Sequence, residues 1–180
     1  MGKTKTLMML ALLLLSAAPA AAKDGFYVGA GTLFNNIRGD TTAPESFEAG
    51  NGPALFGGLG FYGNFAIEAG VWKSKHPAKP GGSANDLEAG TLDLKILFPI
   101  HESHIEPFVL LGAGSYTIEQ GRFTEHGKGG RIGVGIDIYL FPDIALSVGF
   151  AQSHITFRSN TADPDANITS MQYSISYHFE

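Results

Sequence analysis

The sequence predicts an all-β fold, an eight-stranded antiparallel up-and-down transmembrane β-barrel, and three observations support this prediction. Residues 171–179 alternate strictly between apolar and polar side chains, which gives a strand with two unlike faces. Short and long connections alternate between the expected strands, as they do in membrane β-barrels. Beyond the N-terminal leader no apolar run reaches about 18 residues, so a closed barrel is the expected way to enter a membrane.

The first 22 residues have the pattern of a secretory signal peptide. Lys3 and Lys5 precede a short apolar run at residues 7–18, and an alanine-rich cleavage site follows at residues 20–22. We expect cleavage after Ala22, with Ala20 as the alternative. The competing interpretation is a membrane anchor, but the run is shorter than the roughly 20 residues that a spanning helix needs.

Cleavage would leave residues 23–180 as one outer-membrane β-barrel domain of 180 − 22 = 158 residues. The absence of cysteine excludes a disulfide scaffold and a thiol-ligated metal site. Without the two leader lysines the charge balance is 10 − 17 = −7, and no basic patch indicates nucleic acid as a partner.

Eight segments have the length and composition of strands, and the connections between them follow a regular order. Residues 63–64, 100–105 and 141–143 form short turns after the second, fourth and sixth strands. Longer stretches rich in Gly, Pro, Ser, Asn and charge follow the other strands, and we expect them to be extracellular. The expected strands are residues 25–34, 53–62, 65–74, 87–98, 106–118, 130–140, 144–157 and 168–179.

Charged residues in the middle of strands indicate which face is outside. Glu68, Asp93, Lys95 and Asp137 share the polar face of their strands. A Lys or Arg facing lipid costs about 2–4 kcal/mol at the midplane, so we expect these four in the lumen and the aliphatic face outside. A soluble lipocalin-like barrel in the periplasm would reverse the two faces. The phase of the first, second and fifth strands stays open.

The chain resembles the OmpA-like family of small eight-stranded outer-membrane β-barrels. The resemblance rests on residues 26–31, 63–70, 106–114 and 173–179. It implies recognition by the barrel-assembly machinery through a C-terminal signal, to which Gln172, Tyr177 and Phe179 correspond. Ser174 stands where the family has glycine, and Glu180 follows the final aromatic residue.

The four lumen charges form the first candidate site. Counted from the nearest turns, Glu68, Lys95 and Asp137 lie at similar depth, and Glu68 and Lys95 are on neighbouring strands. We hypothesise a salt-bridged plug in an interior already too narrow for an open pore. The alternative is that the charges only fill the lumen, without a gating role.

The basic residues of the long connections and nearby strand ends form the second candidate site. Lys and Arg are suitable partners for lipopolysaccharide phosphates. Acidic residues share these connections, so a mixed hydrophilic surface without specific contacts is the alternative. The candidate contacts are Arg38, Lys73, Lys75, Lys79, Arg122, Lys128, Arg131 and Arg158.

Two patterns suggest chemistry that we do not expect. Residues 101–104 carry two histidines and a glutamate, but they lie in an expected turn without an evident third ligand. Lipid A deacylases of similar barrel size carry a His-x-Ser pair with a later acid. Here His154 and Thr156 are the nearest match, and Ile168 occupies the place of the acid.

We therefore expect a monomeric outer-membrane barrel with a structural or surface-interaction role. We expect no catalytic residue, cofactor or metal site. Its expected partners are outer-membrane lipid, lipopolysaccharide and the assembly machinery.

Overall fold

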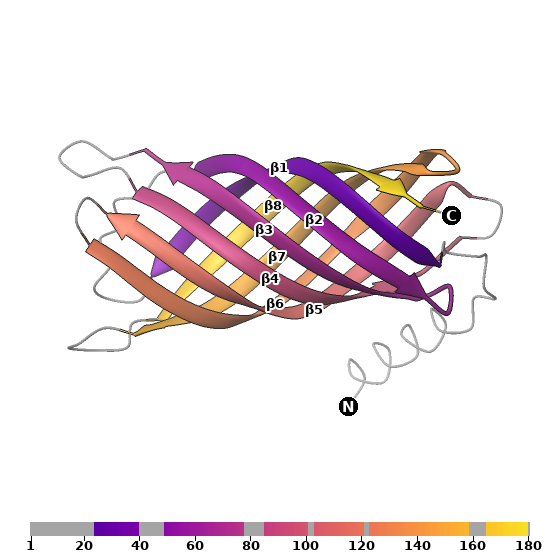
Figure 1. The fold of residues 1–180 in the computed structure, drawn as a ribbon. Helices are drawn as coiled ribbons and strands as arrows, with labels where there is room; N and C mark the ends of the chain where they lie inside the picture. Colours follow the sequence, from indigo (N-terminus) through magenta and orange to yellow (C-terminus); the bar gives the residue numbers. More distant parts are fainter. Residues whose placement is uncertain are drawn as a thin grey trace, which may run out of the picture.

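The computed structural model describes residues 24–39, 49–77, 85–100, 103–120, 123–158 and 165–179. These residues form eight antiparallel strands that close into a single barrel, as the sequence predicted (Figure 1). The expected signal peptide, its cleavage site and Glu180 lie outside the described residues. The strands are β1 (Gly25–Gly39), β2 (Gly50–Phe61), β3 (Phe65–His76), β4 (Asn85–Leu97), β5 (Ile105–Gln120), β6 (Phe123–Phe141), β7 (Ile144–Arg158) and β8 (Asp165–His178).

Each strand pairs with its sequence neighbours, and β1 pairs with β8 to close the barrel. The closure continues to the last described residue, where the Phe179 amide donates to the Phe26 carbonyl over 2.8 Å. The rings of these two residues stack with centroids 5.6 Å apart. Because a closed sheet has no free edge, all strands gain partners on both sides.

The two ends of the barrel differ, and we call them the turn end and the loop end. The turn end carries the short connections, and at residues 62–64 the chain reverses with Tyr62 and Gly63 at φ of 56° and 67°. Glycine adopts this left-handed conformation without steric cost, and the Gly63 amide donates to Asp24 Oδ1 over 2.8 Å. The loop end carries the connections that follow β1, β3, β5 and β7, and the connection after β5 spans only residues 121–122 (Figure 1).

The predicted strand boundaries hold to within one residue at the turn end but are too short at the loop end. The difference is largest in β6, which begins at Phe123 where the sequence predicted residue 130. β5 and β6 pair as far as Gln120 with Phe123, so most of the expected long connection between them is strand. Glycines and outward charged side chains at this end interrupt the alternation of apolar and polar residues, so the sequence did not indicate a strand there.

The outer wall confirms the predicted orientation of the strands. Ile67, Leu92, Ile132 and Ile175 point outward and are exposed, whereas their polar neighbours point into the barrel. The structure also shows which face of β1, β2 and β5 lies outside, which the sequence left open. The large outward side chains of these strands are Phe26, Val28, Phe34, Leu55, Leu59, Ile105 and Leu111. Among the described residues no helix has the length and hydropathy to cross a membrane.

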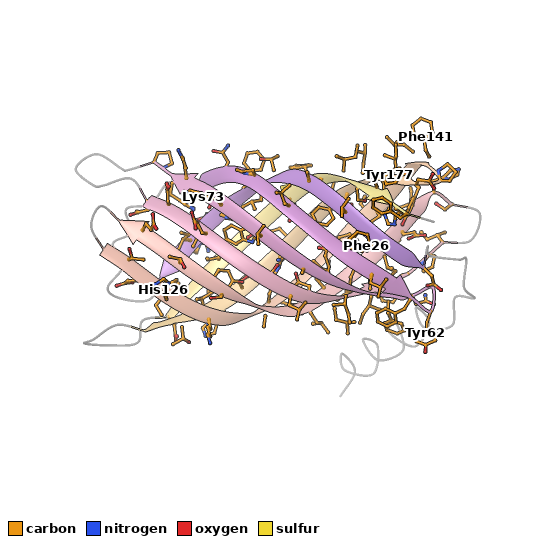
Figure 2. The ribbon with its side chains drawn as sticks, in the orientation of Figure 1. Phe26, Tyr62, Lys73, His126, Phe141 and Tyr177 are labelled. Carbon is orange, nitrogen blue, oxygen red and sulfur yellow. The ribbon has the colours of Figure 1, made fainter. Side chains whose placement is uncertain are left out.

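Aromatic residues surround the turn end on the outside. Figure 2 shows Phe26, Tyr62, Phe141 and Tyr177 at this end, and Lys73 and His126 toward the loop end. Between the two levels the wall is mostly aliphatic, with Phe34, Phe150 and Tyr173 also exposed on it. On β6, Leu140 and Ile132 are about 20 Å apart along the axis at 3.3 Å per residue and a tilt of about 40°. Transmembrane β-barrels carry an apolar band about 25 Å tall with aromatic borders, and the belt of this barrel is close to that height.

Candidate functional site: the closed lumen and the outer rim

The lumen near the turn end contains a charged layer, made of Glu68, Asp93, Lys95, Arg131 and Asp137. Lys95 Nζ lies 2.6 Å from Asp137 Oδ2, and both side chains are almost completely buried. The ammonium group also lies 4.1 Å from the centroid of the Phe108 ring. Lys95 is therefore held by a carboxylate on one side and an aromatic face on the other.

Glu68 belongs to the same layer but has a partner that the sequence did not indicate. The Tyr27 hydroxyl donates to Glu68 Oε2 over 2.8 Å. Tyr27 stacks on His178 with centroids 4.9 Å apart, which fixes its ring. The sequence placed Glu68 and Lys95 on neighbouring strands of one plug, and the ion pair at 2.6 Å joins Lys95 to Asp137 on β6.

Arg131 completes the charged layer, and this corrects its assignment as a lipopolysaccharide contact. Its Nη1 lies 3.2 Å from Asp93 Oδ2 and donates to Thr91 Oγ1 over 3.2 Å. The side chain points into the lumen because it has the same parity as Asp137 on β6. The predicted inward residues of this strand began at Gly133. Extending the alternation two positions toward the N-terminus would have assigned Arg131 to the lumen.

Toward the loop end the lumen becomes apolar. The apolar cluster consists of seven buried residues, with Trp72 and two isoleucines packed against them. The Tyr116 hydroxyl satisfies its polarity by donating to Ser153 Oγ over 2.9 Å. Leu87, Ile155 and Ile168 thus face inward here, beside the buried polar side chains of Asn35 and Ser74. The cluster comprises Leu87, Ala89, Tyr116, Ile155, Phe157, Ala166 and Ile168.

Little free volume remains between the charged layer and the apolar cluster. A cavity of about 40 Å³ lies there, lined by Glu68, Lys95 and Arg131 and by serines of β7 and β8. This volume holds only a few water molecules. The lumen of the described barrel is therefore a closed interior.

A buried polar group near the loop end was missed by sequence reasoning. Asn35 Nδ2 donates to Ser74 Oγ over 3.0 Å, and Ser74 Oγ lies 3.0 Å from His76 Nε2. Asn85, directly opposite His76, is also buried. The parity of Glu68 on β3 places Ser74 and His76 in the lumen, which the expected strand end at residue 74 concealed.

The outer rim separates the remaining candidate cations into different environments. Lys73 Nζ lies 2.7 Å from Glu88 Oε1 and 3.0 Å from Asp86 Oδ2, so its charge is balanced by this chain. Lys75, Lys128 and Arg38 also lie on outward positions of their strands at the loop end, and Arg158 is the last residue of β7. Lys79 and Arg122 lie outside the described residues.

The deacylase-like pair on β7 lacks the arrangement of an acyl hydrolase. Thr156 Oγ1 donates to Asp165 Oδ1 over 2.8 Å, so its hydroxyl does not face an imidazole base. His154 Nδ1 lies 3.1 Å from Asn167 Oδ1, and Asn167 rather than Ile168 is its neighbour across the strands. Ile168 is buried in the apolar cluster.

The histidines and glutamate at residues 101–104 are only partly described. His101 and Glu102 lie outside the described residues, and Ser103 Oγ accepts from the Ile105 amide over 3.1 Å. Within the part of the chain that the structure describes, no group of three or more His, Asp or Glu side chains is arranged to hold a metal ion.

The residues assigned to the assembly signal divide between the two faces of β8. Tyr177 and Phe179 point outward with ring centroids 5.0 Å apart, and Gln172 points into the lumen. This arrangement leaves both rings accessible on the outer wall.

Comparison with known proteins gives a consistent result for the fold. A family model described as the outer membrane protein beta-barrel domain matches residues 7–179. The structure of Neisserial surface protein A is similar at a TM-score of 0.70 and 16% identity, over 86% of this chain and 97% of that one. No curated protein sequence matches the chain.

Two further solved structures are similar. Ail, the attachment invasion locus protein of Yersinia pestis, has a TM-score of 0.57 and 13% identity, over 87% of this chain and 100% of that one. The outer membrane enzyme PagL has a TM-score of 0.53 and 12% identity, over 84% of this chain and 99% of that one. At these identities the likeness establishes the fold alone.

Proposed function

Because the chain belongs to the outer membrane protein beta-barrel family, we propose that it is a closed, non-enzymatic barrel with a structural role in the cell envelope. The long connections are extracellular in this proposal and carry any surface interaction. The observation that supports it best is the lumen, which is filled by two different layers in series.

The two layers block ions by different means. The charged layer fills its level with ion pairs that would have to separate before an ion could pass. The apolar cluster leaves an ion few polar groups at its level, where Ser74 opposite Leu87 already accepts from Asn35, and dewetting of such a constriction stops conduction. A barrel with both layers acts as an anchor rather than a channel.

Bilayer recording of the purified, folded protein tests this closed state. We expect no stable conductance from the wild type or from Lys95→Ala, because the apolar cluster remains. The combination of Lys95→Ala with Ile155→Ser weakens both layers and should give brief openings. Heat-modifiable migration on SDS gels confirms that each variant is folded. Stable open channels of the wild type would overturn the proposal.

A structural role predicts a defect of the envelope when the protein is absent. A deletion strain should be more sensitive to detergents and large antibiotics, and wild-type protein should restore resistance. Lys95→Ala should restore it equally well, because the proposed role needs no gating. Recovery of the protein from the soluble periplasmic fraction would instead support the lipocalin-like alternative.

An acyl hydrolase acting on lipid A is a second candidate, favoured by the contact between His154 and Asn167. The bond from Thr156 to Asp165 argues against it, because the hydroxyl is not presented to a base. Overexpression followed by a lipid A mobility assay distinguishes the two functions. We expect unchanged mobility, and a faster species that His154→Ala abolishes would establish the enzyme.

The proposed partners at the surface are lipopolysaccharide phosphates. The structure leaves fewer candidate contacts than the sequence did, since Arg131 is inside and Lys73 is balanced by Asp86 and Glu88. Outward Lys75, Lys128 and Arg38 are the described cations that support this partner.

A further inference from the structure

The outer wall of the barrel is hollowed over β2 to β6. A groove of about 790 Å³ crosses these strands, and Val28, Leu55, Val71 and Leu92 form its apolar borders. A second hollow of about 530 Å³ shares Leu55, Val71 and Gly90 and ends at Lys73. The two hollows form one continuous depression on the face that the family places in lipid.

Small residues at neighbouring positions create the depression. Gly90, Ser115 and Lys128 lie in one row across β4, β5 and β6. Leu92 and Ala113 lie in the next row, and both Ala113 and Ser115 line the groove. The wall therefore loses side-chain volume at adjoining positions on two strands.

The packing of this chain does not require glycine at position 90. A β-carbon on Gly90 would have no heavy atom within 4 Å, whereas one on lumen-facing Gly112 would overlap the Asp93 carboxylate. At most lumen positions glycine leaves room for a neighbouring side chain. Gly90 faces outward, and no neighbouring side chain occupies the space beside it. The depression is thus free space that something outside the chain is able to fill.

The height of the groove places it beside the outer leaflet. Lys128 lies 12 residues before Leu140 on β6, which corresponds to about 30 Å along the axis. The aliphatic belt covers the first part of this distance, so Lys128 stands at the level of the outer headgroups. A chain lying in the groove would be in hydrocarbon, with its polar end near Lys128.

The charge at this end of the groove complements a phosphate. Among the described residues Lys128 has no ion pair, and His126 is its outward neighbour two positions along β6. His126 Nδ1 lies 3.1 Å from Thr117 Oγ1, so its Nε2 is the nitrogen that turns away from the wall. Lys73, at the end of the second hollow, is already balanced by carboxylates.

We propose that the groove binds an acyl chain of one lipopolysaccharide molecule, with a lipid A phosphate held by Lys128. This rests on the proposed outer-membrane placement with the loop end outside. Apolar borders at Leu55, Val71 and Leu92 contact the chain, and Gly90 provides the depth. His126 lies beside Lys128 on the same face of β6 and offers a further hydrogen-bonding group to the same phosphate.

Native mass spectrometry of the full mature protein tests the site. The protein is refolded in nanodiscs that contain phosphatidylethanolamine with or without purified lipid A, and lipid retained after gentle activation is counted. We expect one lipid A per wild-type barrel. Gly90→Leu fills the groove and Lys128→Gln removes the charge, and each should lower retention by about tenfold.

One matched variant controls for changes at the membrane surface. Ala30→Leu adds a leucine on the outer wall of β1, and Ala30 does not line the groove. This variant should retain lipid A as the wild type does. Heat-modifiable migration shows whether each variant has folded.

Three outcomes overturn the inference. Lipid A retention that is equal in all folded variants would mean adventitious lipid. A two-copy species that Gly90→Leu disrupts would show that the groove contacts a second barrel. Equal retention of phosphatidylethanolamine and lipid A would remove the preference for the lipid A phosphate, since the phosphodiester of phosphatidylethanolamine is balanced by its own ammonium group. Fractionation of cells separates these results from failure of the proposed function, since a protein absent from the outer membrane refutes that placement itself.

Discussion

Replacing Lys95 by methionine separates the buried ion pair from the packing around it. Lys95 Nζ lies 2.6 Å from Asp137 Oδ2, and the two side chains are 8% and 3% exposed. Removing one partner of a buried pair costs about 3–5 kcal/mol, because the other charge stays buried without compensation. Methionine keeps the apolar stem beside Phe108, so little of this loss comes from packing.

Urea unfolding of the protein in phospholipid vesicles measures this free energy. The single tryptophan, Trp72, packs against Tyr116 with centroids 6.1 Å apart and reports on the lumen. We expect the free energy of unfolding to fall by about 3–5 kcal/mol in Lys95→Met. Combining it with Asp137→Asn should recover part of this loss, since no unpaired carboxylate then remains at that position.

Lys73→Met is the matched control, because Lys73 also contacts carboxylates at 2.7 and 3.0 Å but is exposed. An exposed ion pair contributes little because water screens it, and we expect a much smaller loss than in Lys95→Met. Equal losses of unfolding free energy for Lys95→Met and Lys73→Met would refute the reasoning that burial makes the Lys95 ion pair important for stability. So would strict additivity of the Lys95 and Asp137 substitutions.

Four further predictions concern individual side chains. Ile155→Ala removes a fully buried side chain from the apolar cluster and should lower the urea-derived free energy by about 2–5 kcal/mol. Tyr116→Phe removes the donor to Ser153 and should lower it by about 1 kcal/mol. Gly63→Ala puts a β-carbon on a backbone with φ of 67° and should cost about 1–2 kcal/mol, measured in the same titration. Phe179→Ala removes the ring stacked on Phe26 and should reduce the heat-modifiable fraction in membrane extracts; an unchanged fraction would contradict the assembly role.

The alternation of side chains predicted the orientation of most strands, because it is a local property of the chain. Two adjoining residues of a strand always face opposite sides, so Asp93 in the lumen requires Leu92 and Leu94 outside. No knowledge of the partner strand is needed. The strands left open, such as β2 with Gly57, Gly58 and Gly60, have too few informative side chains for this reasoning.

The strand ends at the loop end were missed for a physical reason. There the environment outside the barrel is polar, and Lys73, Lys75 and Lys128 occupy outward positions. Leu87 and Ile155 on the inside show that the alternation continues. The prediction looked for strands with aliphatic residues on the outer face. Charged and glycine-rich segments without such a face therefore resemble the loops between strands.

The partners of the lumen charges were also beyond the sequence. Lys95 and Asp137 are 42 positions apart, and they meet because the barrel closes with a particular register and stagger. The sequence placed both side chains inside but could not say which carboxylate faces the ammonium. Arg131, assigned to the outer rim, lies in the same layer opposite Asp93.

By itself the sequence determined the barrel, its strand order, the distinction between its two ends and the faces of most strands. These properties follow from period-two alternation and turn composition, which act over a few residues. Only the tertiary structure decided that Lys95 pairs with Asp137, that an apolar cluster closes the loop end and that Gly90 opens a groove. Each of these depends on side chains from several strands, whose heights are set by closure of the whole sheet.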